Sequence, residues 1–435
     1  MVDIAPLRGI RYNPNRMTSL CDVIAPPYDV ISPARQAELH GRHETNIIRI
    51  DFGRDKPDDN GGENRYTRAA GYLQRWIHAG ILARDPEPCI YIYQQEYVLE
   101  SGEPKVRTGL LCLVRLEPLD KGIIMAHERT FEHPMSDRLK LALACKALTS
   151  PIYGIFADPD RGFKSATQDI VYNDPPAAHC MDDTGVAHRL WVVSDTGIIA
   201  QVQDAMRHFP VYIADGHHRY ETSLKLRQLK HEEDPEGAAP YDYTLMFLSN
   251  TESSGLTILP AYRVIRDVSE RALSGFRDRL AEFFTIEEHP DMSMQSLIQE
   301  LARRADRHVF AFYKGHGGPC IFELKHDVNL KAVIPRSMSE VRRSLDVTVL
   351  RELVIDQLLD SENEDLSREG NILYAKLAAE AKRMVDNKNA ALAFYHNPVK
   401  VQQVKDVASQ LERMPHKSTY FYPKIPAGLV IHKFY

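Results

Sequence analysis

The sequence predicts a mixed α/β protein built from several structural units. Its 435 residues favour two or three units on length alone. Short apolar runs that fit buried strands alternate with stretches whose apolar residues recur at helical spacing. Such alternation is typical of α/β or α+β architecture. We expect an N-terminal α/β region at 1–120, a middle region at 121–265 and a C-terminal α/β region at 266–435.

The N-terminal region is expected to hold a rigid loop, a helix and a hairpin. Pro26 and Pro27 stand in an apolar context, and proline fixes φ and lacks an N–H, so this stretch is an extended loop. Apolar residues at helical spacing predict a helix over 63–81. Two strand-like runs, 89–99 and 107–116, flank a turn that contains Gly and Pro and predict a hairpin.

The same patterns assign elements to the rest of the chain. We expect helices at 137–148, 221–229, 268–284, 293–306, 347–359 and 400–411, strands at 190–193, 211–214, 308–313, 321–324 and 391–395, hairpin character at 244–248 and 256–265, and polar loops at 232–239 and 360–370.

Bulk composition excludes several classes of protein. Fifty-four basic and sixty acidic residues give a net charge of -6, so the chain has no bulk attraction for nucleic acid or anionic membrane. Six dispersed cysteines form no Cys-x-x-Cys pair, which favours buried, reduced thiols. The N-terminus does not read as a signal peptide, and no apolar stretch is long enough to span a bilayer. We therefore expect a cytoplasmic protein.

The densest group of reactive side chains follows the predicted strand at 211–214. It reads Asp-Gly-His-His-Arg over residues 215–219 and then enters a helix. Glycine permits a sharp turn and a close backbone approach to a ligand, and a helix N-terminus favours anions. Arginine and imidazole donors suit phosphate, and Asp215 can orient a histidine, bind a metal or accept a proton. A solvated surface turn is the weaker alternative.

Two further segments are candidates for the same chemistry. Glu128 and Arg129 follow a histidine, and a functional role and a place on the surface fit them equally well. The cations of 137–140 fit a solvated helix face. Near the C-terminus, residues 414–424 include two lysines, two hydroxyls and three aromatics. The lysines and hydroxyls can bind phosphate. The alternative is an edge strand that packs on the protein through its aromatic side chains. Neither familiar nucleotide-binding glycine loop is present.

These segments resemble a widespread family of formerly uncharacterised microbial proteins, some of which act as pyrophosphate-dependent serine kinases. Their core is related to the ParB/sulfiredoxin-like superfamily, which also includes an ADP-dependent free-serine kinase. The marks of the resemblance lie at 6–12, 25–31, 46–49, 127–130, 137–140, 150–154 and 259–263, with the strongest at 215–222 and 414–424. The glycine-histidine-arginine loop lacks the cysteine that sulfiredoxin chemistry needs, and no basic helix-turn-helix accompanies it.

The resemblance implies phosphoryl transfer from pyrophosphate to L-serine, on a ParB/sulfiredoxin-like core over 121–265, with Mg²⁺ as the companion ion of pyrophosphate. It implies that the C-terminal tail returns to the site. The implied catalytic residues are Asp215, Glu128 and His218, the phosphate-binding residues are Gly216, His217, Arg219, Arg129, Lys417, Ser418, Thr419 and Lys424, the amino-acid pocket is lined by Tyr28 and Asp29, and the metal ligand is Asp215.

Several alternatives stay open at this point. Either Asp215 or Glu128 can serve as general base, since the choice depends on which lies about 3 Å from the serine hydroxyl. Other readings are an ATP- or ADP-dependent serine kinase, a phosphoserine phosphatase and a non-catalytic ParB-like nucleotide-binding module. We expect Asp215→Asn to abolish turnover and leave folding nearly intact. The sequence gives no oligomeric state.

Overall fold

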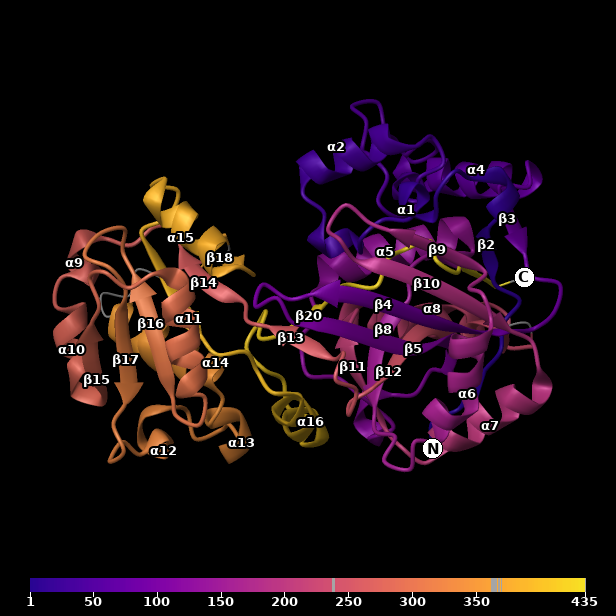
Figure 1. Cartoon of the computed structure of the whole chain (residues 1–435). Coiled ribbons are helices and arrows are strands. Elements are labelled where there is room, and N and C mark those ends of the chain that lie inside the picture. The colour runs from indigo at the N-terminus through magenta and orange to yellow at the C-terminus, as the bar shows by residue number, and fades with distance from the viewer. Residues whose placement is uncertain (237–238, 361–365, 367, 369, 435) are drawn as a thin grey trace. The chain divides into compact units, whose positions relative to one another are not determined.

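The computed structural model describes residues 1–236, 239–360, 366, 368 and 370–434. It confirms the mixed α/β class, and its contacts divide the chain into two compact units (Figure 1). Unit 1 comprises 1–126, 130–257 and 423–435, and unit 2 comprises 127–129 and 258–422. The regions expected at 1–120 and 121–265 both contribute to unit 1, and the C-terminal tail belongs to it as well. The loops expected at 232–239 and 360–370 lie partly outside the described residues.

Unit 1 is built on a nine-stranded sheet with the order β6-β11-β8-β12-β5-β4-β10-β9, to which β1 adds by pairing with β5. Most pairs are antiparallel, but β11 runs parallel to β6 and β12 runs parallel to β8. The strands are β1 Ile4–Ala5, β4 Ile90–Val98, β5 Pro104–Arg115, β6 Ile124–Met125, β8 Ile152–Phe156, β9 Ala178–Met181, β10 Ala187–Val193, β11 Val211–Asp215 and β12 Tyr243–Asn250. Two small sheets pair β2 Ile10–Tyr12 with β3 Leu82–Arg84, and β7 Ala147–Leu148 with β21 His432–Lys433.

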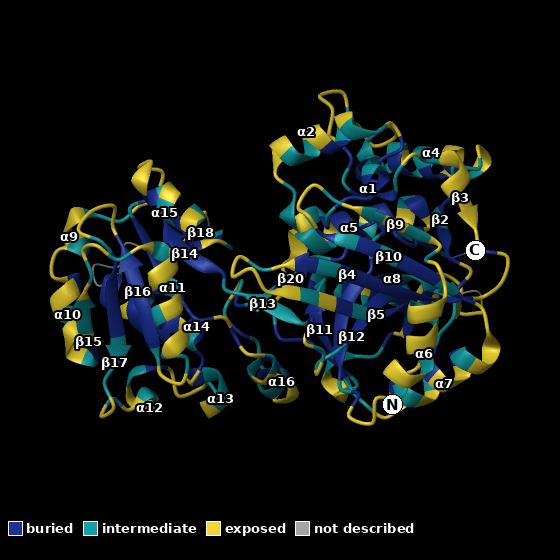
Figure 2. Ribbon diagram, viewed as in Figure 1, coloured by how far each residue is buried: buried dark blue, intermediate teal, exposed yellow. Residues whose placement is uncertain are grey.

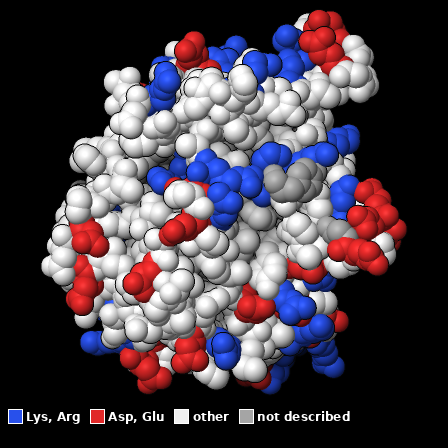
Figure 3. Space-filling view, turned by 90° about the vertical axis from the view of Figure 1, so that its right-hand side faces the viewer, with Lys and Arg blue, Asp and Glu red and all other residues white. Residues whose placement is uncertain are grey.

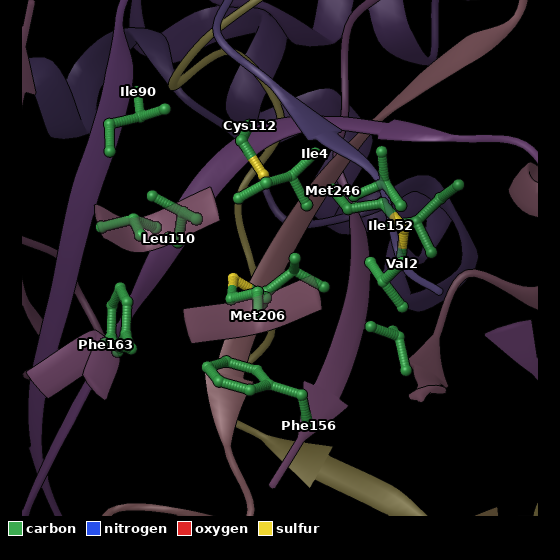
Figure 4. Close-up of a cluster of buried hydrophobic side chains, with 14 of the residues drawn as sticks. Val2, Ile4, Ile90, Leu110, Cys112, Ile152, Phe156, Phe163, Met206 and Met246 are labelled. Carbon is green, nitrogen blue, oxygen red and sulfur yellow. The ribbon is translucent and has the colours of Figure 1, made fainter. Parts of the chain in front are cut away.

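Alternation along these strands sends one set of side chains into an apolar core. Ile90, Leu110, Ile152 and Met246 belong to one buried cluster, which Phe163 joins from a covering helix (Figure 4). Successive strand residues point to opposite faces, so the intervening positions form the other face of the sheet. The helices and helical turns of unit 1 are α1 Leu20–Val23, α2 Pro33–Arg42, α3 Ile48–Asp51, α4 Arg65–His78, α5 Glu132–Cys145, α6 Gly162–Asn173, α7 Thr196–Arg207, α8 His217–Glu233 and the 3-10 turns Pro14–Arg16, Tyr28–Val30, Leu119–Lys121 and Ala239–Tyr241. Helix α4 packs on α5, α5 on α8, and α6 on α7.

Unit 2 contains a six-stranded sheet with the order β15-β17-β16-β19-β14-β18, in which every pair is antiparallel. Strand β16 shows how both faces are buried: Phe310 and Phe312 enter one apolar cluster, whereas Val309 and Ala311 enter another. Its elements are β13 Thr257–Leu259, β14 Tyr262–Ile265, α9 Glu270–Leu273, α10 Phe276–Phe283, β15 Phe284–Glu288, α11 Met294–Arg303, β16 Val309–Tyr313, β17 Cys320–Leu324, α12 Leu330–Val333, α13 Glu340–Arg343, α14 Asp346–Thr348, the π-helical segment Val349–Leu359, β18 Ile372–Ala375, α15 Ala378–Asp386, β19 Leu392–His396, α16 Val401–Ser409 and β20 Tyr420–Tyr422.

Three local expectations are wrong. The segments 244–248 and 256–265 form no hairpin, because β12 pairs with β5 and β8 whereas β14 pairs with β18 and β19. The helix expected over 268–284 is two helices, interrupted at Gly275, which has a positive φ of 73°. Helix α8 begins at His217 rather than at 221, so both histidines lie in its first turn.

The expectation of six reduced thiols is also wrong for two of them. Cys21 and Cys180 form a disulfide with a Cα–Cα distance of 5.7 Å, which joins α1 to the edge strand β9. Cys89, Cys112, Cys145 and Cys320 are free and buried. Because the thiol argument for a reducing compartment fails for this pair, the cytoplasmic location stays a prediction.

The surface is polar and of mixed charge. Buried residues fill the strands, and exposed residues line the outer sides of the helices (Figure 2). On the face shown in Figure 3, Lys and Arg form a band that acidic side chains interrupt. Among the described residues, no helix is long and apolar enough to cross a membrane.

Candidate functional site

The strand-to-helix junction predicted from 215–219 exists as expected. Strand β11 ends at Asp215, and a register shift between Ile213 and Asp215 marks a local irregularity next to β8. Gly216 follows with φ 88°, a left-handed conformation that glycine adopts without steric cost. Helix α8 then begins, and its N-cap residue Gly216 makes no side-chain capping hydrogen bond. Its N-terminal amides and dipole favour an anion.

Glycine is required at 216 for space as well as for conformation. A Cβ atom there would lie 2.9 Å from Nε of Arg219, closer than real Cβ contacts allow. The guanidinium therefore packs directly over the turn. Arg219, in the first turn of α8, therefore lies close to the turn at Gly216.

Asp215 is the centre of a buried ion-pair group. Its Oδ2 accepts a hydrogen bond of 2.7 Å from Nη2 of Arg219, and its Oδ1 pairs with Nζ of Lys424. The side chains of Asp215, Arg219 and Lys424 are 12%, 8% and 11% exposed. Three residues that the sequence nominated from two distant segments therefore meet in unit 1.

The sheet fixes the backbone that carries Lys424. The carbonyl of Lys424 accepts a 3.1 Å hydrogen bond from Nε2 of Gln95, and the carbonyl of Pro423 accepts one from Nη2 of Arg107. Arg107 is fully buried on β5, and its guanidinium lies 4.9 Å from the ring centroid of Tyr153. These contacts hold the C-terminal tail against the sheet and place Lys424 beside Asp215.

The two histidines have different environments. His217 is buried, whereas His218 is partly exposed and its ring stacks on Phe131 at 6.1 Å. The backbone N–H of Phe131 donates to Nε2 of His218 at 3.0 Å. Because a backbone N–H can only donate, Nε2 must be unprotonated in this arrangement, and His218 is then the neutral Nδ1–H tautomer.

The segment 137–140 begins with a buried ion pair, so the solvated face expected for its cations is wrong for Arg138, whereas Lys140 is exposed. Nε of Arg138 donates to Asp137 at 2.8 Å, and Arg65 and Tyr66 bind the same carboxylate. Burial alone would lower the pKa of Arg138, but the Asp51 and Asp137 carboxylates outweigh burial and raise it. Arg138 is therefore a permanently charged buried cation.

The residues nominated for an amino-acid pocket differ in placement. The Arg138 guanidinium lies 4.0 Å from the ring centroid of Tyr28, whereas Asp29 is exposed. Burial raises the pKa of the Tyr28 phenol, and the cations Arg138 and Arg219 partly offset the increase. Tyr28 thus lies near both arginines, and its role and that of Asp29 stay predictions.

The remaining nominated residues belong to unit 2 and meet one another there. The backbone N–H of Lys417 donates to Oε1 of Glu128 at 3.2 Å, and Thr419 lies 2.9 Å from Nε2 of His127. Ser418 donates to a backbone carbonyl at 2.6 Å. Arg129 is exposed. The segments 127–129 and 414–421, far apart in the chain, are thus one structural group.

The described residues contain no group of three or more His, Cys, Asp and Glu side chains that could hold a metal ion. Asp215 is the nominated metal ligand, and both of its oxygens already bind cationic side chains. This donor set does not fit a resident metal. The Mg²⁺ ion expected with pyrophosphate therefore stays a prediction.

Several residues that shape the site were not nominated from the sequence. All four of these residues are buried: Gln95 and Arg107 hold the backbone at 423–424, and Thr149 donates a hydrogen bond to Asp51. The sequence contains a signal for Arg107 alone. This arginine begins a predicted strand at a position that the alternation of side chains assigns to a buried face. The other three residues lie in segments whose residue types are common in a protein core or in a turn.

The comparisons with known proteins now give the family. The model of the family DUF1015, described as a protein of unknown function, matches residues 4–348, and the chain belongs to this family. No curated protein matches.

Solved structures that resemble the chain include the following three. A free serine kinase in complex with AMP aligns at a TM-score of 0.37 with 12% identity, covering 72% of this chain and 86% of that one. A conserved hypothetical protein from Pyrococcus furiosus gives 0.35 and 13%, with 73% and 93% covered. SbnI with a C-terminal truncation, from Staphylococcus aureus, gives 0.34 and 9%, with 72% and 84% covered. Likeness at these TM-scores carries no argument about activity.

Proposed function

We propose that this protein transfers a phosphoryl group from pyrophosphate to the hydroxyl of free L-serine. The observation that carries the proposal is the Asp215 carboxylate held between Arg219 and Lys424 at the N-terminus of α8. Helix amides and buried cations stabilise the charge on transferring phosphate oxygens, and a carboxylate beside them can receive a proton. The family resemblance of the same segments supports this reading over a structural ion pair.

The proposed step is a single displacement. The serine hydroxyl oxygen bonds to one phosphorus of pyrophosphate, the bond from that phosphorus to the bridging oxygen breaks, and phosphate leaves. The hydroxyl proton passes to a carboxylate, for which Asp215 and Glu128 remain the candidates. Mg²⁺ enters as the complex of pyrophosphate and offsets its charge.

Several nominated residues have a role in this scheme. Lys424 neutralises donor charge, and His217, His218 and the α8 amides contact donor oxygens. Arg219 holds Asp215 in place through Nη2. Glu128, Arg129 and 417–419 belong to unit 2, and their roles stay predictions.

The test is phosphoserine formation, measured by mass spectrometry with L-serine and Mg²⁺ and with pyrophosphate, ADP or ATP in separate reactions. We expect product from pyrophosphate alone. Product from ADP or ATP instead identifies a nucleotide-dependent serine kinase. Phosphate release from phosphoserine without an acceptor identifies a phosphatase, and tight nucleotide binding without turnover identifies a binding module. Any of these three results rejects the proposal.

A matched pair of lysine variants tests the site itself. Lys424→Met should lower the rate about a hundredfold, because one charge-stabilising group is removed and the chain length is kept. Lys225→Met is the control, since Lys225 is exposed on the same helix α8. Equal rates for the two variants would remove Lys424 from the mechanism.

A further inference from the structure

The Cys21–Cys180 disulfide fastens a short helix to the edge of the large sheet in unit 1. Cys21 lies in α1, which packs on the edge strand β9 that carries Cys180 (Figure 1). The two cysteines are 159 residues apart in sequence, so the bond closes a long loop. Helix α1 has only four residues, and a helix of that length has little stability of its own. Its position therefore depends on its bonds to other segments, of which the disulfide is the covalent one.

The chain that leaves α1 is connected to the ion-pair group of Asp215 through the C-terminal tail. The N–H of Ala25 donates to the carbonyl of Ala427 at 3.3 Å, and the N–H of Ala427 donates to the carbonyl of Ala25 at 2.8 Å. Ala427 lies three residues after Lys424, whose Nζ pairs with Asp215. One backbone pairing thus joins the segment that follows the disulfide to the tail that carries the lysine.

The same segment has a second contact with buried charge. The ring of Tyr28 lies 4.0 Å from the Arg138 guanidinium, which in turn bonds to Asp137 and to the Asp51 carbonyl. Tyr28 lies seven residues after Cys21 in the chain. The segment 25–31 is therefore in contact with the tail at one end and with a buried cation at its middle, and a displacement of α1 would disturb both contacts.

The two sulfurs differ in access, and the other cysteines are poor partners for exchange. Cys180 is partly exposed, whereas Cys21 is 7% exposed. Thiol–disulfide exchange needs an accessible sulfur and an attacking thiolate. The free thiols are Cys89, Cys112, Cys145 and Cys320, and burial raises the pKa of each of them. They stay protonated at neutral pH, so an external thiolate that attacks Cys180 is the favoured route to reduction.

We propose that the Cys21–Cys180 disulfide is a redox switch that controls how firmly the C-terminal tail holds Lys424 at Asp215. The reductant is a dithiol, and one of its thiolates bonds to Sγ of Cys180. The disulfide bond breaks, and Cys21 leaves as a thiolate that takes up a proton. The second thiolate of the reductant then displaces Cys180 as a thiol. Two electrons pass to the protein, and the reductant leaves as a disulfide.

The reduced form keeps its fold and loses a restraint. A chain of 435 residues has a large core and does not need one disulfide to fold. Without the covalent link to β9, α1 moves more freely, the pairing of Ala25 with Ala427 opens more often, and the tail holds Lys424 less firmly. The consequence for catalysis rests on the proposed function, in which Lys424 neutralises donor charge, so reduction slows phosphoserine formation.

The first experiment is hydrogen exchange followed by mass spectrometry on the full chain, with and without dithiothreitol. We expect the amides of 423–428 and of 22–31 to exchange about tenfold faster after reduction. The segment 244–248, in the middle of the large sheet, is the internal control and should keep its protection. Unchanged exchange at 423–428 overturns the proposal. Loss of the far-ultraviolet circular dichroism on reduction also overturns it, because the disulfide is then required for the fold.

The second experiment uses a matched pair of cysteine variants. Cys180→Ser removes the disulfide, so its exchange should equal that of the reduced wild type and should not respond to dithiothreitol. Cys320→Ser is the control, because Cys320 is a buried free thiol of unit 2, and this variant should respond to dithiothreitol as the wild type does. A response that persists in Cys180→Ser overturns the proposal, since the reductant then acts elsewhere. Cys21→Ser replaces Cys180→Ser if that variant does not fold.

The activity assay separates this proposal from the proposed function. With pyrophosphate and L-serine, reduction should slow phosphoserine formation about 3- to 30-fold, and reoxidation with diamide should restore the rate. Equal rates for the oxidised and reduced chains reject the switch and keep the function. Absence of phosphoserine in both states, together with faster exchange at 423–428 after reduction, rejects the function and keeps the switch.

Discussion

Replacing Asp215 with Asn removes the carboxylate that two buried cations share. Arg219 and Lys424 are 8% and 11% exposed, and Asp215 itself is 12% exposed, so water compensates little for the lost charge. Removing one partner of a buried pair costs about 3–5 kcal/mol. Asparagine keeps one hydrogen-bond acceptor, so we expect about 2–4 kcal/mol here. This is a large part of the 5–15 kcal/mol that typically separates folded and unfolded states.

The sequence alone predicts nearly intact folding for this variant, and the burial of Asp215, Arg219 and Lys424 revises that prediction. The measurement is urea unfolding followed by tryptophan fluorescence. Both tryptophans of the chain, Trp76 and Trp191, lie in unit 1, so the signal reports the unit that holds Asp215. We expect the unfolding midpoint to fall together with the loss of turnover.

Asp183 provides a control with the same number of cations on one carboxylate. It pairs with Arg35 and Arg42, and the three side chains are 40%, 25% and 19% exposed. Solvent screening reduces the value of such pairs, so Asp183→Asn should cost less than about 1 kcal/mol. Equal losses of stability for the two variants would refute the argument, since they would mean that burial does not strengthen the pairs at Asp215.

The remaining predictions concern the turn, a buried histidine and the cysteines. Gly216→Ala should cost about 1–2 kcal/mol, because a left-handed residue gains a Cβ, and should lower the phosphoserine rate because that Cβ displaces Arg219. Burial, followed by the charge of a neighbouring arginine, lowers the pKa of His396 to about 3, below the unfolded value near 6.5. The unfolded state then binds more protons between these values, so stability is fully present above pH 6.5 and is lost as pH falls toward 3. Between pH 7 and 5 the wild type should lose about 2 kcal/mol more than His396→Gln, measured by circular dichroism in urea. Thiol titration of the denatured, unreduced chain should find four thiols, with Cys21 and Cys180 appearing only after reduction, and finding six at the start would contradict the disulfide.

The spacing of apolar residues correctly predicted helices and strands that are buried on one face or on all sides. The helix at α4 and the strands β4, β10, β11, β16 and β19 lie where apolar spacing indicated them. Pairing could not be recovered in the same way, because strand partners are set by contacts between distant segments. The segments 244–248 and 256–265 are neighbours in sequence and look like a hairpin, yet their strands enter different sheets.

Part of the candidate site could be predicted from the sequence for a related reason. Asp215 and Lys424 were found because reactive residue types cluster in their segments, and the structure brings them together. The grouping of 127–129 and 414–421 in unit 2, apart from Asp215, could not be read from residue types. Local spacing specifies neighbours along a helix or strand and carries no information about which unit a segment joins.

Buried charge is the signal that separates structural from functional groups in this protein. Arg138 is satisfied by Asp137 and by the Asp51 carbonyl, so its burial needs no ligand. Asp51 is different, because its Oδ1 accepts a hydrogen bond from Thr149 whereas its buried Oδ2 has no hydrogen-bond partner among the described residues. A buried carboxylate half satisfied by the protein is unfavourable unless something else completes it. The incomplete hydrogen bonding of Asp51, rather than its charge or burial, is therefore what distinguishes it from Arg138.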